Sequence, residues 1–310
     1  YMRFIFFLTL IFNLVLLANN NKKILILNSY HKGFELSDTI IKNIEKEFYL
    51  HDNIDINILY MDAKRIYSRD YIKELTDLYA LQLKDRNYDL IITIDRFAYS
   101  LAVKNFSTFV HNKPMLFVGL EQYSQELLKI YNIHSKVHGI IQKQPIESNI
   151  ELIFKFMPNI KKLYILNDRS PNGNDTSPFI IKAIKRYKSK IKIEYLRDDT
   201  LEEFKTYFST YKKEEAILFV RYSNDMNGNF YKTNEIAQAI NSFQLPVFVT
   251  DNLFIQKGAL GGKLIPIHTL GTSAAKKALD ILSKKIKKRW TGRKGLALRS
   301  YVPGRIPCDT

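Results

Sequence analysis

Polar and aromatic side chains stand together at the points where several predicted strands end. Rings can stack on a small organic ligand, and carboxylates can accept hydrogen bonds from its ammonium or hydroxyl groups. The candidates for such a ligand site are Ser29, Tyr30, Asp95, Phe97, Glu121, Asp168, Tyr222 and Asp251. An Asp or Ser at a strand-to-helix junction is also a common helix N-cap, so the prediction depends on the whole set rather than on any single member.

Sequence signals for catalysis are weak in the same loops. Ser29 and His31 are two residues apart on a loop, which does not make a nucleophile–base pair, and no G-x-S-x-G segment occurs. His134 and His138 are four residues apart in an apparent loop beside Gly139, and the six histidines show no metal spacing. No phosphate-binding glycine loop or calcium loop occurs. The sequence therefore predicts a binding protein with no catalytic residue, no cofactor and no metal.

Short apolar runs must position these loops. Continuous runs of Ile, Leu and Val are typical of parallel strands that helices cover on both faces. The predicted strands of the first half are residues 23–28, 56–61, 90–94 and 115–119. The predicted strands of the second half are residues 163–166, 191–195, 216–220, 247–250 and 263–266.

Amphipathic segments between these runs predict helices. They cover residues 38–49, 71–84, 177–187, 201–211, 233–242 and 272–286. Ser37 or Asp38 is expected to cap the first helix, and Ser68 the second. The alternation predicts an α/β fold of two doubly wound parallel-sheet lobes with a hinge, in which ligands bind beyond the carboxyl ends of the strands.

The chain length of 310 residues suits two domains of similar size. Residues 23–143 are expected to form the first lobe and residues 144–250 the second. Residues 251–288 are expected to hold a crossing segment, a strand and the last helix. We expect the chain to cross between the lobes near residues 120–145 and again near residues 249–252.

The net charge of +16 raises the possibility of a nucleic-acid partner. About half of this excess lies after residue 283, and the remaining lysines are scattered beside Glu and Asp on predicted helix faces, as on solvated surfaces. The sequence therefore predicts a small-molecule ligand and no nucleic acid. The only cysteine is Cys308, which excludes an intrachain disulfide and suits a bacterial periplasm.

The two ends of the chain differ from its body. Residues 1–18 combine Arg3 with a short apolar run, which predicts a secretory signal peptide or, alternatively, an uncleaved N-terminal anchor. Either interpretation places the body in the periplasm. Residues 289–310 hold the only Trp and the only Cys among glycines and arginines, which indicates an atypical tail of truncated, frameshifted or vector origin or, alternatively, a natural basic tail.

Several segments together resemble the ABC transporter substrate-binding family with the type I periplasmic binding fold. The resemblance extends over about residues 23–286 and rests on ILILNSYHKGFELSD from Ile24, YMDAKR from Tyr60, YDLIITIDRFA from Tyr88, LFVGLEQY from Leu116, LNDRSPNG from Leu166 and GALGGKL from Gly258. The most similar branch comprises the extracytoplasmic sensor domains of bacterial histidine kinases and diguanylate cyclases. The resemblance implies two lobes, a hinge and a ligand in the cleft, with amino acids among the ligands that some members take. Past Lys288 the chain departs from the pattern of that branch.

These observations predict an extracytoplasmic solute-binding protein that closes on a small organic ligand, such as an amino acid or a similar metabolite. A membrane permease or a signalling module would read the closed state. One alternative is a truncated sensor domain of a histidine kinase or diguanylate cyclase. A second alternative is a hydrolase with the same two-lobed shape.

Overall fold

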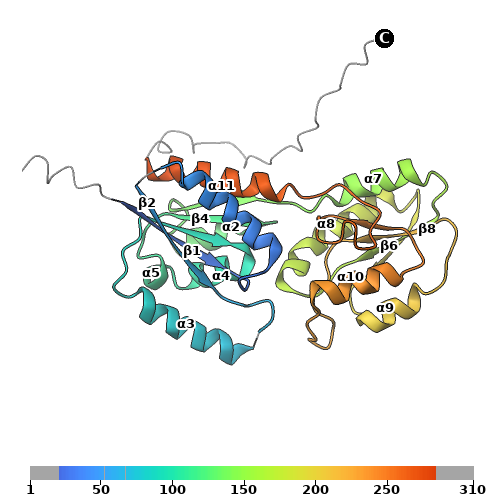
Figure 1. The fold of residues 1–310 in the computed structure, drawn as a ribbon, viewed down its shortest axis with the longest axis horizontal. Helices are drawn as coiled ribbons and strands as arrows, with labels where there is room; N and C mark the ends of the chain where they lie inside the picture. Colours follow the sequence, from blue (N-terminus) through green and yellow to red (C-terminus); the bar gives the residue numbers. More distant parts are fainter. Residues whose placement is uncertain (1–20, 52, 67, 284–310) are drawn as a thin grey trace, which may run out of the picture.

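The computed structural model describes residues 21–51, 53–66 and 68–283, which form two α/β lobes side by side (Figure 1). The predicted signal segment and the predicted tail therefore lie outside the described residues. The first lobe has a sheet of five parallel strands in the order β2-β1-β3-β4-β5. These strands are β1 (Lys22–Asn28), β2 (Ile54–Tyr60), β3 (Leu90–Ile94), β4 (Met115–Leu120) and β5 (Val137–Ile141).

The second lobe repeats this plan with four parallel strands in the order β7-β6-β8-β9. They are β6 (Lys162–Leu166), β7 (Lys192–Leu196), β8 (Glu215–Phe219) and β9 (Val247–Val249). The predicted fold class is confirmed. In both sheets the second strand along the chain pairs outside the first and the chain then reverses direction across the sheet, which leaves a crevice at the carboxyl ends of the central strands.

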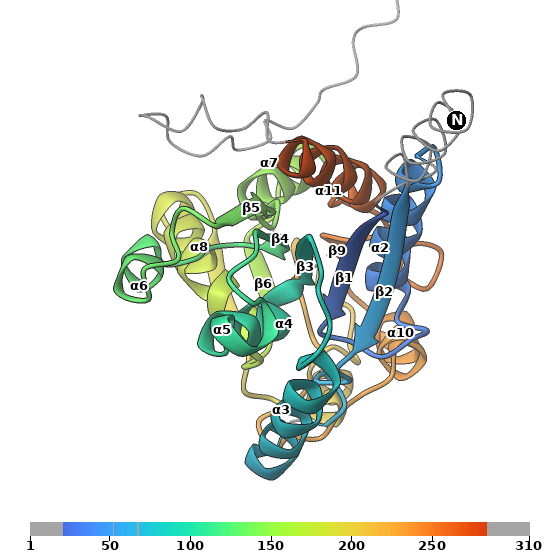
Figure 2. The same ribbon diagram turned by 90° about the vertical axis from the view of Figure 1, so that its left-hand side faces the viewer.

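Helices cover both faces of the first sheet and create two apolar cores (Figure 2). The helices α2 (Glu35–Phe48) and α11 (Ile267–Leu282) pack on one face. The helices α3 (Arg69–Leu83), α4 (Asp95–Lys104) and α5 (Phe106–Phe109) pack on the other. The short helix α6 (Gln125–Ile130) follows β4. Because both faces are covered, β3 is buried at every position, as its unbroken apolar sequence predicts.

The second sheet is covered in the same way. The helices α7 (Ile146–Phe156) and α8 (Pro171–Tyr187) pack on one face. The helices α9 (Leu201–Tyr207) and α10 (Thr233–Ser242) pack on the other. An α9 capping box closes the first turn, where the Thr200 hydroxyl accepts from the Glu203 amide and the Glu203 carboxylate accepts from the Thr200 amide.

The chain passes between the lobes twice within the described residues. It first leaves β5 through residues 142–145 and enters α7, and it later returns from β9 through residues 250–266 to α11. Helix α11 then packs against α2 of the first lobe. Gly271 permits this packing, because a Cβ atom there would lie 2.5 Å from the Ile40 carbonyl oxygen.

Several elements differ from the sequence expectation. The helices α4, α5, α6 and α7 form where no helix is predicted. The segment at residues 263–266 forms no strand, because its neighbour Gly261 makes only an isolated bridge to Phe248 and the chain is crossing between lobes there. Conversely, β5 was expected to be a loop. It pairs with β4 along its length, and His138 lies in that strand rather than in a loop.

Helix starts also shift from their expected positions. Helix α2 begins at Glu35 with no side-chain cap, so the predicted caps Ser37 and Asp38 lie inside it. Ser68 does cap α3, as predicted, by accepting from the Tyr71 amide. Helix α8 begins at Pro171, six residues earlier than expected, because Ser170 caps it and proline suits a first helical position.

No helix in the described part of the chain has the length and apolar character needed to cross a membrane.

Candidate ligand-binding cleft

The carboxyl ends of both sheets meet at a cleft with two adjoining compartments. The larger compartment has a volume of about 380 Å³ and the smaller one about 320 Å³. Both are lined by residues of both lobes. Six residues line both compartments, and we call this set the waist: Tyr30, Lys64, Arg65, Asp95, Arg221 and Ser223.

The larger compartment combines rings with charges of both signs. Aromatic residues reach it from both lobes, among them Phe34, Phe219, Tyr222 and Phe254. Asp251 contributes a carboxylate, and its Oδ1 accepts from the Leu253 amide at 2.9 Å. Burial raises the pKa of Asp251, and the positive charges of Arg221 and Lys64 oppose this rise.

The smaller compartment has a more apolar outer wall. Phe97, Pro171 and Met226 line it, together with Asn172 at the start of α8. Ser29 also lines it, but its hydroxyl donates to the Ile94 carbonyl at 2.7 Å and accepts from the Ala98 amide at 2.9 Å. Ser29 therefore ties the end of β1 to the start of α4.

Tyr30 and Asp95 form a hydrogen-bonded pair at the waist. The Tyr30 hydroxyl donates to Asp95 Oδ2, and Asn172 Nδ2 of the other lobe donates to the same carboxylate oxygen at 2.8 Å. The Arg96 amide donates to Asp95 Oδ1 at 2.5 Å. Burial raises the pKa of Asp95 in spite of these bonds. Both oxygens of this carboxylate already accept hydrogen bonds from the protein, and the bond from Asn172 links the two lobes.

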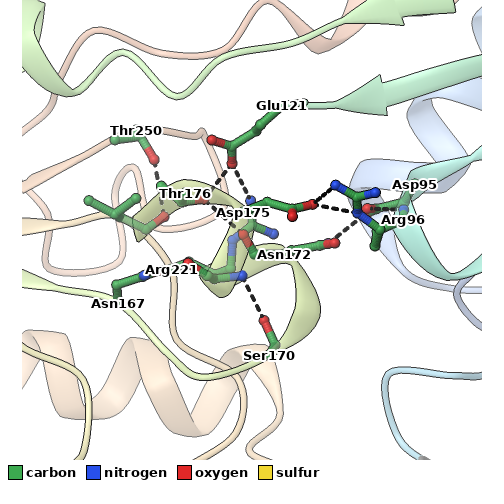
Figure 3. A network of polar contacts seen from close by, with 12 residues as sticks. Asp95, Arg96, Glu121, Asn167, Ser170, Asn172, Asp175, Thr176, Arg221 and Thr250 are labelled. Atoms are coloured by element: carbon green, nitrogen blue, oxygen red, sulfur yellow. Dashed lines mark hydrogen bonds and ion pairs between the residues drawn. The ribbon is translucent and has the colours of Figure 1, made fainter. Parts of the chain in front are cut away.

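Glu121 lies behind the waist, next to the waist residue Arg221 (Figure 3). Thr176 on α8 donates its hydroxyl hydrogen to Glu121 Oε1, and Arg221 Nη2 lies 3.4 Å from the same oxygen. Burial raises the pKa of Glu121 to about 7, against the lowering effect of Arg221. Glu121 Oε2 and Arg221 Nε are both buried and have no hydrogen-bond partner among the described residues.

The first turns of α8 contact the first lobe beside Glu121, and we call this contact the flank. Arg96 on α4 forms an ion pair with Asp175 on α8, and both side chains are mostly buried. Asn172 and Thr176 add the hydrogen bonds to Asp95 and Glu121 shown in Figure 3. The lobes thus share a polar contact beside the open cleft.

Asp168 lies beneath the cleft and lines neither compartment. Its Oδ1 accepts from the amide and hydroxyl of Ser170, and its Oδ2 accepts from the amide and hydroxyl of Ser223, both at 3.0 Å. The side chain is fully buried. It holds the loops after β6 and β8 together, so the geometry favours a structural role over the ligand contact that the sequence suggested.

Tyr222 and Phe97 also pack into the protein. The Tyr222 hydroxyl donates to the Asp199 carbonyl at 2.6 Å, and its ring stacks with Tyr231. Phe97 is partly buried against the first-lobe core. Each still contributes to one compartment wall.

The eight predicted site residues therefore fall into four groups. Tyr30 and Asp95 meet at the waist, and Glu121 lies behind it. Asp168 lies beneath the cleft. The others each line one of the two compartments: Ser29, Phe97, Tyr222 and Asp251.

The predicted site residues include none of the three cations of the waist, of which Lys64 and Arg221 are the two that Asp62 does not hold. Lys64 lies on the loop after β2, half-buried, with its Nζ 4.2 Å from the ring centre of Phe34. Arg221 is the second residue after β8. Both lie just beyond strand ends, the same signal that selected the acids, and charge alone did not separate them from many surface lysines and arginines.

Metal binding has no support in the described residues. Within residues 21–283, positions 52 and 67 apart, no group of three or more His, Cys, Asp or Glu side chains could hold a metal ion.

Residues 62–288 match the family model described as ABC transporter substrate binding protein. This match covers well over half of the chain. No curated protein matches the sequence.

Solved structures share the two-lobed fold at low sequence identity. A Streptococcus pneumonia ABC domain in complex with L-Trp has a TM-score of 0.58 and 19% identity, over 85% of each chain. A Clostridium difficile substrate binding protein with adhesive properties, in a ligand-free, open structure, has a TM-score of 0.57 and 18% identity, over 84% of this chain and 85% of that one. A Bacteroides fragilis protein assigned to the LacI transcriptional regulators has a TM-score of 0.60 and 11% identity, over 86% of this chain and 92% of that one.

Proposed function

The chain belongs to the ABC transporter substrate-binding protein family, and from this premise we propose that it closes on a small, amino-acid-like ligand outside the cytoplasm. The family binds small molecules rather than converting them, and it is extracytoplasmic. Beyond family membership, we propose the ligand class, the site residues and the use of the closed state.

The pairing of opposite charges within one aromatic-lined cleft carries the proposal. Asp251 can accept hydrogen bonds from a ligand ammonium, and Arg221 and Lys64 can donate to a ligand carboxylate. Rings such as Phe34 and Phe254 line the same compartment and suit an apolar side chain. A free amino acid has these three features together.

Closure is the mechanism that fits two lobes joined by two crossings. Tyr30, Lys64 and Asp95 come from the first lobe, and Arg221 and Asp251 come from the second side of the cleft. A ligand that contacts both sides binds the closed form better, and this differential affinity shifts the population toward closure.

We propose ABC-type uptake as the use of the closed state, because the matching family takes its description from ABC transporters. In this proposal residues 1–18 direct export, residues 23–143 and 144–250 form the lobes, and residues 289–310 are dispensable for binding. The resemblance to sensor domains of histidine kinases and diguanylate cyclases has no counterpart among the comparisons.

The experiment begins with the purified full-length protein, which is denatured so that bound small molecules can be identified by mass spectrometry. A thermal-shift panel of the L-amino acids, with L-tryptophan included, follows. A ligand at a hundred times its dissociation constant should stabilise the protein by about 2.7 kcal/mol.

The matched variants are Asp251→Asn, at the cleft, and Asp55→Asn, on an exposed strand position far from it. Only the first should lose the ligand-dependent stabilisation. If sugars or other uncharged solutes stabilise the protein and no amino acid does so, the proposed ligand class is wrong.

A further inference from the structure

The waist of the cleft contains two cations that no acidic side chain fully occupies. Among its other members, Arg65 is held by both oxygens of Asp62, at 2.7 Å from Nε and 2.5 Å from Nη2. Tyr30 and Asp95 bond to each other, and Ser223 bonds to Asp168. The free hydrogen-bond donors of the waist therefore belong to Lys64 and Arg221.

Lys64 is held in place by rings rather than by a carboxylate. Its Nζ lies 4.2 Å from the ring centre of Phe34 and 5.5 Å from that of Tyr30, and these two rings stack at 4.4 Å. Lys64 forms no hydrogen bond or ion pair with the described residues. A cation–π contact fixes the position of an ammonium and leaves its three N–H donors available.

Arg221 is only loosely paired. Its contact with Glu121 Oε1 is long, at 3.4 Å, and its Nε is buried without a partner among the described residues. The Glu121 carboxyl group has a raised pKa of about 7, so it neutralises the guanidinium only in part near neutral pH. A planar guanidinium with free donors suits a bidentate carboxylate.

The two cations also repel each other across the cleft. Burial lowers the pKa of Lys64 to about 8, the positive charge of Arg221 is the next largest cause of this decrease, and the carboxylates of Asp168 and Asp251 oppose it. Lys64 belongs to the first lobe and Arg221 to the second. An empty cleft therefore contains a repulsion between the lobes that an anion could convert into attraction.

We propose that Lys64 and Arg221 form a two-lobe clamp for the acid group of the ligand, so that a carboxylate closes the cleft and an uncharged analogue does not. This inference rests on the proposed function for its choice of carboxylate. It adds that the acid group, rather than the amine or the side chain, couples binding to closure.

A ligand-free experiment tests the clamp independently of ligand identity. Spin labels are attached at Leu81→Cys on α3 and Tyr211→Cys beyond α9, two exposed positions on different lobes, in a Cys308→Ser background. Lys64→Glu supplies a carboxylate to Arg221 and should shift the distance distribution toward the closed form without ligand. Lys42→Glu, the same charge reversal on the exposed face of α2, should leave the distribution unchanged. If the two variants give the same distribution, the clamp is wrong.

Calorimetry with paired probes then tests the acid group. Each amino acid that binds is compared with its own carboxamide, which retains the ammonium and the side chain. We expect the carboxamide to bind on the order of a hundredfold more weakly. Lys64→Met and Arg221→Met should each remove most of this difference, and Lys42→Met should retain it.

The outcomes separate the two proposals. Equal affinity for an amino acid and its carboxamide overturns the clamp and leaves the proposed function intact. Greater stabilisation by inorganic phosphate than by any carboxylate also overturns it, because the anion is then a phosphate. If no amino acid binds but Lys64→Glu closes the empty cleft, the clamp is supported and the proposed ligand class fails.

Discussion

At the residue scale, the cleft separates side chains that hold the protein together from side chains that remain available. Asp95 and Asp168 are carboxylates whose oxygens already accept several hydrogen bonds from the protein. Asp251 accepts one, from a backbone amide. Availability, rather than residue type or position after a strand, therefore distinguishes a ligand contact from a support.

Asp168→Ala should lower the free energy of unfolding by about 2–4 kcal/mol, because it leaves the buried amide and hydroxyl of Ser223 without their acceptor. Urea denaturation measures this change. Asp198→Ala is the matched control, since its partner Arg169 is exposed and such pairs contribute about 0–1 kcal/mol. An Asp168→Ala variant as stable as the control would refute the structural role.

Glu121→Gln should flatten the pH dependence of stability between about pH 4.5 and 7. The folded protein holds the Glu121 proton more tightly than the unfolded chain, because burial raises this pKa from 4.5 to about 7. The stability that comes from this proton is complete below pH 4.5 and is lost as the pH rises through 7. The difference is on the order of 3 kcal/mol for a shift of this size.

Urea denaturation at several pH values between 4 and 8, for the wild type and Glu121→Gln, measures this difference. The difference between the two proteins isolates Glu121 from Asp95 and Asp251, whose pKa values are also raised. Parallel pH profiles for the two proteins would contradict the assignment.

At the element scale, α8 and α11 determine how the lobes meet. Helix α8 begins directly after the Asp168 turn, and its first turns reach across to Asp95, Arg96 and Glu121. Helix α11 returns from the second lobe and packs on α2, which follows the first cleft loop. Helix α8 of the second lobe therefore contacts the first lobe directly, and α11 connects the second lobe to the packing of the first.

Gly271→Ala should destabilise the first lobe by roughly 1–3 kcal/mol, although alanine favours a helix more than glycine does. The reason is steric, because the new Cβ would lie 2.5 Å from the Ile40 carbonyl oxygen and 2.7 Å from the Asn43 Cβ. Lys276→Ala, on the exposed face of α11, should change stability by less than about 0.5 kcal/mol. Thermal unfolding of both variants decides the question, and equal midpoints would show that α11 can move away from α2 without cost.

At the scale of the whole molecule, two crossings and one polar flank limit how the lobes can move. The crossings at residues 142–145 and 250–266 join the lobes, and the Arg96–Asp175 ion pair contacts both beside the cleft. A rotation that closes the cleft can keep this flank in contact while the waist residues approach. The flank then contributes to the resting distance between the lobes.

Arg96→Met should widen the ligand-free molecule, because it leaves Asp175 without its cation and loosens the contact between α4 and α8. Small-angle X-ray scattering should give a larger radius of gyration than for the wild type, and ligand affinity should fall severalfold. Arg86→Met, at an exposed position outside the cleft, should leave both quantities unchanged. A radius of gyration equal to that of the control would show that the flank does not hold the lobes.

The sequence by itself determined the two-lobed α/β fold. Runs such as residues 90–94 are apolar throughout because the strands are buried on both faces, and this local pattern identifies a parallel sheet. It also predicted the cleft loops, since parallel strands all end at the same edge. The strand β5 was missed because it is short and interrupted by His138 and Gly139, and pairing with β4 stabilises it.

Only the tertiary structure decided which residues in those loops are free. Asp168 and Asp251 have the same side chain and similar positions after strands, yet one is saturated by Ser170 and Ser223 and the other faces the cleft. Lys64 and Arg221 are far apart in the sequence, and the folding of two lobes brings them to one waist. Hydrogen-bond saturation and charge pairing depend on neighbours distant in the chain, so no local pattern contains them.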